Sequence, residues 1–373
     1  MPKTPDKKYD YLIVGGGISG LSHAYHLTRE GYSVLVLDSE NCLSNASFNS
    51  TAITSHDPDA HWDAVIKQFG IEGARDIWKL SEISLKQLRD YASKASPHFA
   101  ARRLPAHIFS QSPEKTAELR EQFELYKKLG AKASFEEGHT SVHSSFHSVL
   151  TVADEGQSNN QAILKSFVKI VKRQGGKILT YHPVEKIDAS SGAVVVTTKN
   201  GAIFHGKEVI VATGASSGLV PGAPSTDKKR TFVLAFDKKQ IPKPFKNSVM
   251  WDIEEPYHYI RSFRGRIVWV GGSDVYEKEY DPKKNYYAAV EKFAREKLGL
   301  DASYKHSGEW SGTFYPGGKL GLPYIGRIKN SPVHISYGFG GTGILTSFIS
   351  GFLFTEWLRG RETQYKKFFA PDR

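Results

Sequence analysis

The stretch from Tyr11 to Gly20, YLIVGGGISG, decides the fold. An apolar run ends in consecutive glycines, and Gly15, Gly17 and Gly20 form a GxGxxG motif that opens the next segment. That segment, LSHAYHLTREG, has apolar residues at helical spacing, and the run SVLVLD after it is almost continuously apolar. This order predicts a strand, a helix and a second strand of a parallel sheet that is buried on both faces.

Each glycine of the motif has a physical role at a phosphate-binding turn. Gly15 permits the tight turn, Gly17 lets the backbone approach a pyrophosphate, and Gly20 allows the helix to pack closely on the strand. Asp38 ends the second strand, where its carboxylate can accept hydrogen bonds from an adenosine ribose and would repel a 2′-phosphate. The motif therefore predicts an ADP-containing dinucleotide, disfavours NADP, and leaves NAD and FAD open.

The composition is that of a packed globular chain. Of its 373 residues, 39% are hydrophobic and 24% are charged, which excludes a mainly disordered chain or a coiled coil. Cys42 is the one cysteine, so no intrachain disulfide and no multi-cysteine metal site can form. The formal net charge is +11, but the basic residues are spread along the chain without a nucleic-acid-binding motif. We therefore expect a solvated basic surface rather than a nucleic-acid partner.

No segment has the pattern of an export signal or a membrane span. The N-terminal residues MPKTPDKKYD lack the apolar run of a secretory signal. The most apolar stretch near the C-terminus, Ile344–Leu358, is too short and too interrupted by polar residues to span a bilayer, and it predicts a buried helix. We therefore expect a cytoplasmic protein without a transmembrane segment.

The first sheet is predicted to resume after an interruption. A helical period over 161–174 precedes the strand-like run KILTY, and two more apolar runs, AVVVTT and EVIVATG, follow. The runs YHYIRSF and IVWVGGSD alternate aromatic and polar residues, which is typical of an antiparallel sheet. We expect a nucleotide-binding domain made of 1–80, 150–222 and 306–373, and a second domain made of 81–149 and 223–305.

Several later runs, together with the N-terminal motif, resemble one enzyme family. They are VIVATGASSG, YIRSFRGRIVWVGGSD, WSGTFYPGGKLGLPYIG and YGFGGTGILTS. In this order they are similar to the D-amino-acid oxidase-like FAD oxidoreductases, which include glycine oxidase, sarcosine oxidase and related amine oxidases and dehydrogenases. The resemblance implies FAD and an α/β fold, in which a Rossmann-like FAD-binding domain is interleaved with an α+β substrate domain built on an antiparallel sheet.

The resemblance also implies which residues contact FAD. Gly15, Gly17 and Gly20 would face its pyrophosphate and Asp38 its ribose. The further positions are Ser39, Ser44, Ser47, Asn49, Ser50, Val184, Thr213, Gly214, Gly340, Gly341, Thr342, Gly343 and Ile344. The last five open the final helix, whose N-terminal amides would stabilise negative charge on a reduced flavin. Cys42 lies too near the adenosine end to resemble the cysteine that tethers flavin in sarcosine oxidase, so we expect non-covalent FAD.

On the substrate side, the resemblance implies that a hydride leaves the carbon next to an amine nitrogen for flavin N5. Tyr257, His258, Tyr259 and Arg261 lie on the strand that lines this side in the family, and alternation places His258 on the opposite face. We consider these four and Phe314 as catalytic candidates, with Arg261 as a binder of an anionic group or as an interdomain contact. Phe314 matches a carboxylate-binding arginine of glycine-oxidase-like members, which disfavours a simple α-amino acid.

The expected function is that of an FAD-dependent oxidase or dehydrogenase acting on a small amine or amino acid. Oxygen, a quinone or a carrier protein is the electron acceptor. Two alternatives stay open, namely a flavoenzyme that acts on a modified tRNA base and a flavin-binding subunit without turnover. His139, His143 and His147 recur every fourth residue, but the Ser, Thr and Val around them favour strand or loop, and we expect no metal site. The oligomeric state is undefined by the sequence.

Overall fold

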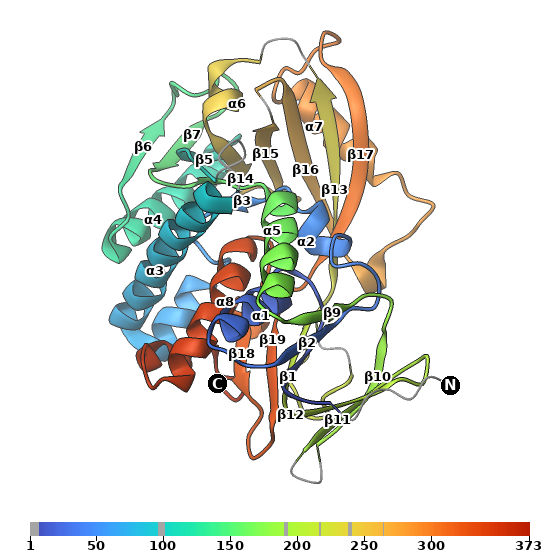
Figure 1. The fold of residues 1–373 in the computed structure, drawn as a ribbon. Helices are drawn as coiled ribbons and strands as arrows, with labels where there is room; N and C mark the ends of the chain where they lie inside the picture. Colours follow the sequence, from blue (N-terminus) through green and yellow to red (C-terminus); the bar gives the residue numbers. More distant parts are fainter. Residues whose placement is uncertain (1–6, 96–100, 190–192, 216–217, 238–240, 264) are drawn as a thin grey trace.

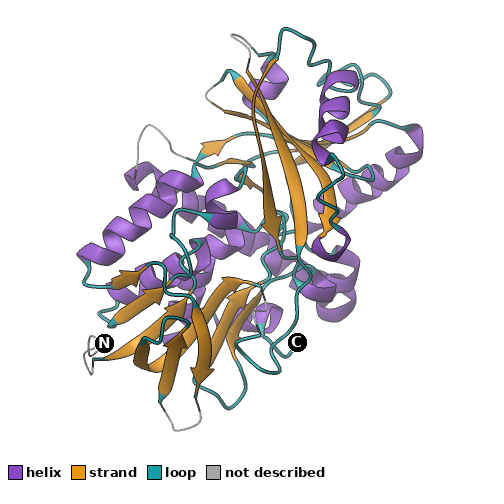
Figure 2. Cartoon of the chain, turned by 90° about the vertical axis from the view of Figure 1, so that its right-hand side faces the viewer, coloured by secondary structure: helices purple, strands orange, loops and turns teal. Residues whose placement is uncertain are grey.

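The computed structural model contains two large β-sheets with helices packed around them (Figure 1). Figure 2 shows the same arrangement from the side, with the two sheets at opposite ends of the molecule. The structure describes residues 7–95, 101–189, 193–215, 218–237, 241–263 and 265–373.

The first sheet contains the predicted strand, helix and strand. β1 (Lys8–Val14) and β2 (Val34–Leu37) flank α1 (Ile18–Arg29) and pair in parallel. The strand order is β10-β11-β12-β1-β2-β9, and β19 pairs with the C-terminal half of β12 and with β18. The remaining strands are β9 (Lys177–Leu179), β10 (Val184–Asp188), β11 (Val194–Thr198), β12 (Ile203–Gly214), β18 (Tyr324–Arg327) and β19 (Val333–Tyr337). The predicted α/β fold, with a sheet that resumes after an interruption, is confirmed.

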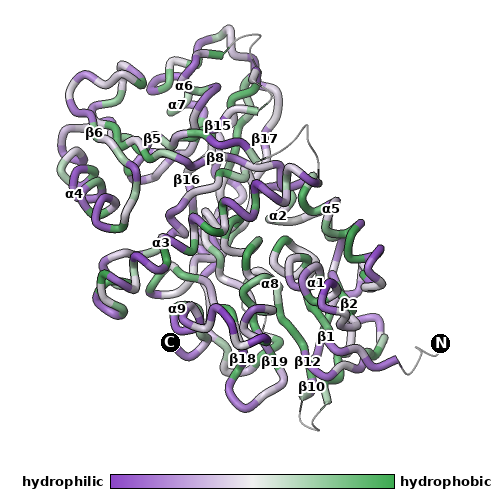
Figure 3. Tube along the Cα trace, turned by 60° about the vertical axis from the view of Figure 1, so that its left-hand side comes forward, coloured by the Kyte–Doolittle hydropathy of each residue, from purple (hydrophilic) through white to green (hydrophobic). Residues whose placement is uncertain are grey.

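Both faces of this sheet are buried. Tyr11 and Ile13 of β1 pack on one side with α1, α5 (Asn160–Arg173) and α8 (Ile344–Leu358). Leu12 and Val14 lie on the other side, among the apolar residues of β11 and β12. In Figure 3 the hydrophobic colour follows β1, β12 and α8 through the centre of this half. Burial on both faces explains the nearly continuous apolar sequence of β1 and β2.

The second sheet has the order β17-β13-β16-β15-β14-β5-β7-β6. Its neighbours are antiparallel, except that β14 and β5 pair in parallel. α7 (Tyr286–Glu296) covers one face and contributes Val290 and Phe293 to its core. The strands are β5 (Ala106–Ser110), β6 (Ala133–Glu137), β7 (Ser148–Val152), β13 (Lys229–Asp237), β14 (Val249–Asp252), β15 (His258–Phe263), β16 (Ile267–Tyr276) and β17 (Lys305–Phe314).

The other helices surround the two sheets. α3 (Trp62–Ala95) is interrupted at Gly70, whose φ is 74°, and packs on α4 (Pro113–Leu129) and α8. Shorter elements are α2 (Asn45–Asn49), α6 (Lys243–Asn247), α9 (Lys366–Phe369), three 3₁₀ turns (Glu277–Glu279, Gly318–Leu320, Thr363–Tyr365) and a small sheet of β3 (Ile53–Thr54), β4 (Arg102–Arg103) and β8 (Gly156–Gln157). Within the described ranges, we find no helix with the length and apolar character of a membrane span.

The predicted domain division and the two sheets differ at β17 and at the end of β7, where residues 150–152 belong to the second sheet. Strands of the first sheet fall within 1–80, 150–222 and 306–373. β17 belongs to the second sheet, although the division assigned 306–373 to the nucleotide-binding part. Its pairing partner β13 is distant in sequence, so the spacing of local motifs carried no information about this strand.

The three regularly spaced histidines lie in the loop between β6 and β7. His143 Nδ1 lies 2.7 Å from Ser145 Oγ, and His147 Nδ1 lies 2.9 Å from Thr116 Oγ1. His139 is exposed. The described part of the chain has no group of three or more His, Cys, Asp or Glu side chains placed to hold a metal ion.

Candidate active site

The glycine-rich turn lies where two parallel strands end side by side. Val14 at the end of β1 is opposite Val211 of β12, so the turns that follow β1 and β12 meet at the same edge of the sheet. Gly15 has a φ of 106°, and a Cβ at this position would overlap the carbonyl oxygen of Ala212. Ligands of such sheets bind at the carboxyl ends of the strands, at the start of the following helix.

Gly20 has the close-packing role that the motif predicts. It lies inside α1, and a Cβ there would overlap the carbonyl oxygen of Gly15. It is not among the residues that line the cavity described below, unlike Gly15 and Gly17. Gly20 therefore allows α1 to pack against the turn, and its contact with the pyrophosphate stays a prediction.

Asp38 follows β2 and lies at the same edge of the sheet as the glycine turn. Its Oδ2 accepts a hydrogen bond from the N–H of Gly16 at 2.6 Å, and its Oδ1 accepts one from the N–H of Glu40 at 3.0 Å. Each carboxylate oxygen can accept more than one hydrogen bond, so both retain capacity for a hydroxyl of a ligand. The backbone bonds fix the carboxylate beside the glycine turn.

One large cavity joins this edge to the second sheet. Its volume is about 1320 Å³, which exceeds the roughly 300–1000 Å³ typical of a pocket for a single small ligand. Every predicted FAD residue except Gly20 lines it, namely Gly15, Gly17, Asp38, Ser39, Ser44, Ser47, Asn49, Ser50, Val184, Thr213, Gly214, Gly340, Gly341, Thr342, Gly343 and Ile344. The cavity has room for a dinucleotide and for a second molecule at its far end.

Cys42 lies at the dinucleotide end of the cavity. A Cβ at Gly16 would overlap its sulfur, so thiol and glycine turn are packed together. Burial, with a smaller effect of the Asp38 charge, raises the pKa of Cys42 to about 12. The side chain is therefore a neutral thiol at physiological pH, the less nucleophilic form of cysteine.

The start of α8 forms the opposite wall of the cavity. The N–H of Gly340 donates to the carbonyl of Tyr315 at 2.9 Å, and the N–H of Gly341 donates to Oδ2 of Asp59 at 2.8 Å. The hydroxyl of Thr342 is buried and has no hydrogen-bond partner among the described residues. An unsatisfied hydroxyl beside a helix N-terminus fits a polar, electron-rich ligand group. Together with the glycine cradle at Gly15, it fits FAD spanning the cavity.

Two tyrosines form the wall at the far end of the cavity. Tyr257 precedes β15 and Tyr259 lies within it, and both line the cavity with ring centroids 6.0 Å apart. Tyr259 lies over Gly271 of β16, where a Cβ would overlap the ring. The Tyr259 hydroxyl lies 3.0 Å from Thr231 Oγ1. Phe314, at the end of β17, completes the wall close to Gly341.

His258 lies on the opposite face of β15, as alternation predicts. Its Nδ1 is 3.0 Å from Oδ2 of the buried Asp252, and its ring stacks on Phe293 at 3.8 Å between centroids. It does not line the cavity. The structure therefore places His258 in the core under α7 and outside the cavity lining.

Arg261 also lies outside the cavity lining. Its guanidinium donates to the carbonyl of Thr51 and to that of Ser158 at 3.3 Å, and lies 4.8 Å from the Trp269 ring centroid. Burial, with a smaller effect of Arg102, lowers the pKa of Arg261 to about 9. Arg261 thus connects the second sheet to loops of the first half, as in the predicted interdomain alternative.

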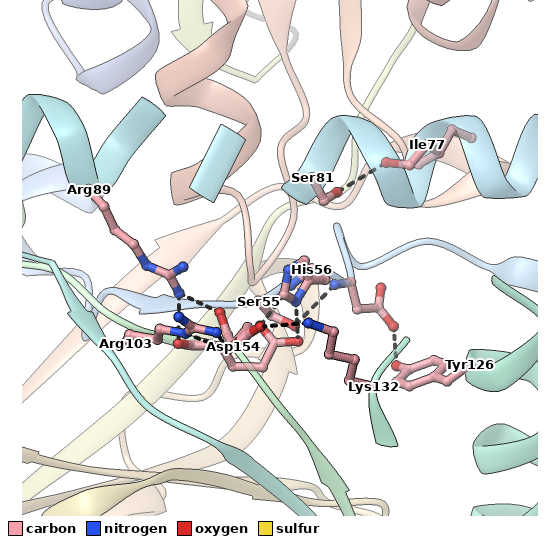
Figure 4. Close-up of polar contacts among 11 residues, drawn as sticks. Ser55, His56, Ile77, Ser81, Arg89, Arg103, Tyr126, Lys132 and Asp154 are labelled. Atoms are coloured by element: carbon pink, nitrogen blue, oxygen red, sulfur yellow. Dashed lines mark hydrogen bonds and ion pairs between the residues drawn. The ribbon is translucent and has the colours of Figure 1, made fainter. Parts of the chain in front are cut away.

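Three acidic residues at the far end of the cavity were not predicted. Asp57 accepts hydrogen bonds from the Tyr126 hydroxyl at 2.5 Å and the indole of Trp62 at 3.1 Å, and burial raises its pKa to about 6. Figure 4 labels Tyr126, whose hydroxyl has a dashed line to this carboxylate. Asp59 has a φ of 68° and holds the N–H of Gly341. Asp274 lies on β16. The sequence signals were a carboxylate within the strand IVWVGGSDVY and the polar run HDPD.

The comparisons with known proteins agree with this geometry. The family described as FAD dependent oxidoreductase matches residues 10–357. Glycine oxidase of Bacillus licheniformis is 22% identical over 383 residues, covering 98% of this chain and 98% of that protein. Gamma-glutamylputrescine oxidoreductase of Escherichia coli (strain K12) is 23% identical over 382 residues, covering 96% and 85%.

A solved structure has the same fold. Glycine oxidase from Geobacillus kaustophilus superposes with a TM-score of 0.82 at 16% identity, covering 98% of each chain. The family match extends over both sheets and includes the glycine turn, the tyrosine wall and most of α8. The chain therefore belongs to the FAD-dependent oxidoreductase family and is an enzyme whose cofactor is FAD.

Proposed function

We propose that this enzyme oxidises the C–N bond of a small amine that carries no carboxylate next to the reacting carbon. The observation that carries the proposal is the single cavity that runs from the glycine turn to a wall of Tyr257, Tyr259 and Phe314. The chemistry that FAD supplies when bound is acceptance of a hydride from the carbon beside the amine nitrogen, with the electrons passing later to oxygen, a quinone or a carrier.

The residues that would hold FAD are those of the two strand-end turns and of the α8 N-terminus. Gly15 and Gly17 leave space for a pyrophosphate, and Asp38 offers acceptor capacity to the ribose. The backbone amides of Thr342 and Gly343 and the Thr342 hydroxyl offer donors at the opposite wall. The protein thereby contributes binding and orientation.

The charge of the far wall argues against an α-amino acid. Phe314 stands where the family resemblance places a carboxylate-binding arginine. Among the described residues around the cavity, Arg230 is the one arginine, and Glu277 already binds it, with Nη2–Oε1 at 2.8 Å and Nε–Oε2 at 3.1 Å. A carboxylate clamp requires a free guanidinium that can make two parallel hydrogen bonds. We find none there.

The residues of the wall suit an uncharged reacting nitrogen. Oxidation needs the nitrogen lone pair, so the amine must lose its proton before the carbon gives up the hydride. The C–N single bond then becomes C=N, and water hydrolyses the product to a carbonyl compound and the released amine. Tyr257, Tyr259 and Phe314 exclude water from the reacting carbon and hold it against the flavin-binding wall.

An anaerobic titration tests the proposal. The purified holoenzyme is mixed with a panel of primary and secondary amines, and the same amines carrying an α-carboxylate serve as matched controls. Loss of the visible absorbance of oxidised flavin with the plain amines, and a much smaller loss with the carboxylated ones, is expected. Readmitting oxygen or adding a quinone then identifies the electron acceptor by the return of colour.

Two outcomes would contradict the proposal. Flavin reduction by the α-carboxylated amines at equal or lower concentration would restore an amino acid as substrate. Failure of every amine to reduce the flavin would favour a flavin-binding subunit without turnover, or a substrate such as a modified tRNA base.

A further inference from the structure

A β-bulge directs one carboxylate of the second sheet towards the cavity. In the pairing of β13 with β16, Arg230 is opposite Val275 and Phe232 is opposite Gly272. Ser273 and Asp274 of β16 therefore face the single residue Thr231 of β13. Bulges of this kind turn a side chain away from regular alternation and are frequent beside active sites.

The backbone of the bulge is tightly constrained. Ser273 has a φ of 54°, in the left-handed region that few non-glycine residues adopt. Gly272 has a φ of 151°, and a Cβ there would lie 2.5 Å from the carbonyl oxygen of Tyr257 and 2.9 Å from the His258 ring. The bulge thus links the orientation of Asp274 to the strand that carries the tyrosine wall.

The Asp274 carboxylate forms no ion pair with the described residues. Both of its oxygens are buried and make no hydrogen bond of regular geometry within the described part of the chain, although the hydroxyls of Thr231 and Tyr257 lie close to them. Of its polar neighbours, the hydroxyl of Thr231 is engaged with that of Tyr259. Burial raises the pKa of Asp274 to about 6, an increase that Thr231, Tyr257 and Lys229 partly oppose. The group is therefore ionised at neutral pH, and an ionised carboxylate in this environment is unfavourable until a positive charge approaches it.

The basic residues of the same wall are engaged elsewhere. Lys228 and Arg230 bind Glu277. The Lys229 ammonium lies over the Tyr276 ring, 4.7 Å from its centroid. None of these three side chains forms an ion pair with Asp274, which leaves its carboxylate available to a cationic ligand.

The surroundings of Asp274 are those of a site for an organic cation. Tyr257 and Tyr259 present aromatic rings, whose faces attract ammonium groups. Asp59 adds an accessible carboxylate to the same end of the cavity. The Asp274 oxygens are shielded from water. Dissolved salt and solvent therefore screen the attraction between Asp274 and a cation less than they screen the attraction between a surface carboxylate and a cation.

We propose that Asp274 selects substrates that carry a second, non-reacting cationic group, such as diamines. The inference rests on the proposed amine oxidation. The reacting nitrogen must be neutral, and a carboxylate beside it would hold it protonated. The ammonium that Asp274 attracts is therefore a different group of the same molecule, and it would bind where Asp274 lines the cavity beside Tyr257 and Tyr259.

Binding of inert cations tests this inference apart from catalysis. The ligands are a diamine whose amine-bearing carbons carry no hydrogen, and the monoamine in which hydrogen replaces one amino group. Neither can be oxidised, so calorimetry on the holoenzyme reports affinity alone. The wild-type enzyme is expected to bind the diamine about tenfold to a hundredfold more tightly, and Asp274→Asn to lose most of this preference. Asp274→Glu, which keeps the charge, is expected to retain it.

A control variant and the thermal unfolding temperature distinguish a role of Asp274 in substrate selectivity from a purely structural role. Asp227→Asn makes the same chemical change at an exposed position outside the cavity, and it should leave the diamine preference unchanged. Removing an unpaired buried charge should raise the thermal unfolding temperature of ligand-free Asp274→Asn above that of the wild type. A purely structural Asp274 would instead give a lower unfolding temperature and equal losses for both ligands.

Further outcomes separate this inference from the proposed function. Reduction of the flavin by amines, together with equal affinity of the wild type for the two inert ligands, would overturn the role of Asp274 and leave amine oxidation standing. A slower limiting rate of flavin reduction by a monoamine in Asp274→Asn, with a shifted pH profile, would mean that Asp274 acts on the reacting nitrogen and would also overturn it. If no amine reduces the flavin, the proposed function fails, whatever the inert ligands do.

Discussion

The carboxylate of Asp59 accepts a hydrogen bond from the backbone N–H of Gly341, with 2.8 Å between Oδ2 and N. This contact joins the loop before α3 to the turn that begins α8. The loop conformation is held in turn by Asp57, whose Oδ1 accepts from the N–H groups of Asp59 at 2.9 Å and Ala60 at 3.2 Å. A negative charge is thereby fixed at the wall that we assign to the flavin ring.

Asp59→Ala is expected to raise the reduction potential of bound FAD. The reduced flavin carries negative charge, and removal of the carboxylate frees the Gly341 amide to stabilise it. We expect an increase on the order of 30 mV, which is about 1.4 kcal/mol for a two-electron couple. A redox titration with a reference dye measures it. Asp63→Ala, an exposed substitution on α3 outside the cavity, should leave the potential unchanged, and a lower potential for Asp59→Ala would contradict the assignment.

Arg261→Met is expected to destabilise the protein and to leave the selectivity among amines unchanged. The substitution leaves the carbonyls of Thr51 and Ser158 without this donor, at a cost of roughly 2–4 kcal/mol in the free energy of unfolding. Arg266→Met is the matched control, because Arg266 forms an exposed pair with Asp237 that contributes little to stability. Denaturant unfolding measures both. Unchanged stability with weaker binding of carboxylated amines would instead make Arg261 a substrate residue.

FAD is expected to leave the protein when the chain is denatured. The Cys42 thiol is buried beside Gly16, at the end of the cavity opposite the tyrosine wall, and its raised pKa keeps it neutral. Acid or urea denaturation followed by filtration should therefore give yellow filtrate and colourless protein. Cys42→Ala, with a side chain that also fits this packed site, should bind FAD as the wild type does. Colour retained by the denatured wild type and lost in Cys42→Ala would show a covalent link.

Stability is expected to depend on pH through Asp274. Its pKa is raised from 3.8 to about 6, so between these values the folded protein holds a proton that the unfolded chain has released. The free energy of unfolding therefore falls as pH rises from about 4 to 6 and stays lower above this window. Relative to wild type, Asp274→Asn should be equally stable at pH 4 and more stable at pH 7, by on the order of 3 kcal/mol.

The other titratable groups around Asp274 do not change the expected stability difference between the wild type and Asp274→Asn. Lys229 faces it from β13, Asp59 from the loop before α3, and Tyr257 and Tyr259 from the β15 side. Burial raises the pKa of both tyrosines, so neither changes charge in this window. Asp57 titrates near the same pH, but it does so in both proteins and cancels in the comparison. Denaturant unfolding at several pH values gives the result, and a constant difference from pH 4 to 7 would contradict the assignment.

Local sequence was sufficient for the elements that carry the cofactor. The glycine motif, Asp38 and the apolar runs predicted β1, α1 and β2, because each depends on contacts between near neighbours in sequence. The same holds for α5 and α8, whose periods and glycine boundaries lie within one segment. Gly20 has the helix-packing role that the motif predicted.

Sequence patterns predicted only part of the substrate wall. Alternation along β15 separated His258 from Tyr257 and Tyr259. It could not show that Arg261, on the same face as Tyr259, lies beyond the end of the cavity, because that depends on where loops from the other half cross the sheet. Asp274 was missed because its orientation follows from a change of register against β13, a strand distant in sequence.

The pairing of β12 with both β1 and β19 has a consequence for how the chain is made. During synthesis β1 and β12 can meet early, but the partner for Val209–Gly214 is β19 at Val333–Tyr337, which leaves the ribosome much later. Until then, a row of unpaired backbone groups on an apolar strand is open to association with other chains. Nascent or truncated chains that lack β19 should therefore depend on chaperones and aggregate in their absence.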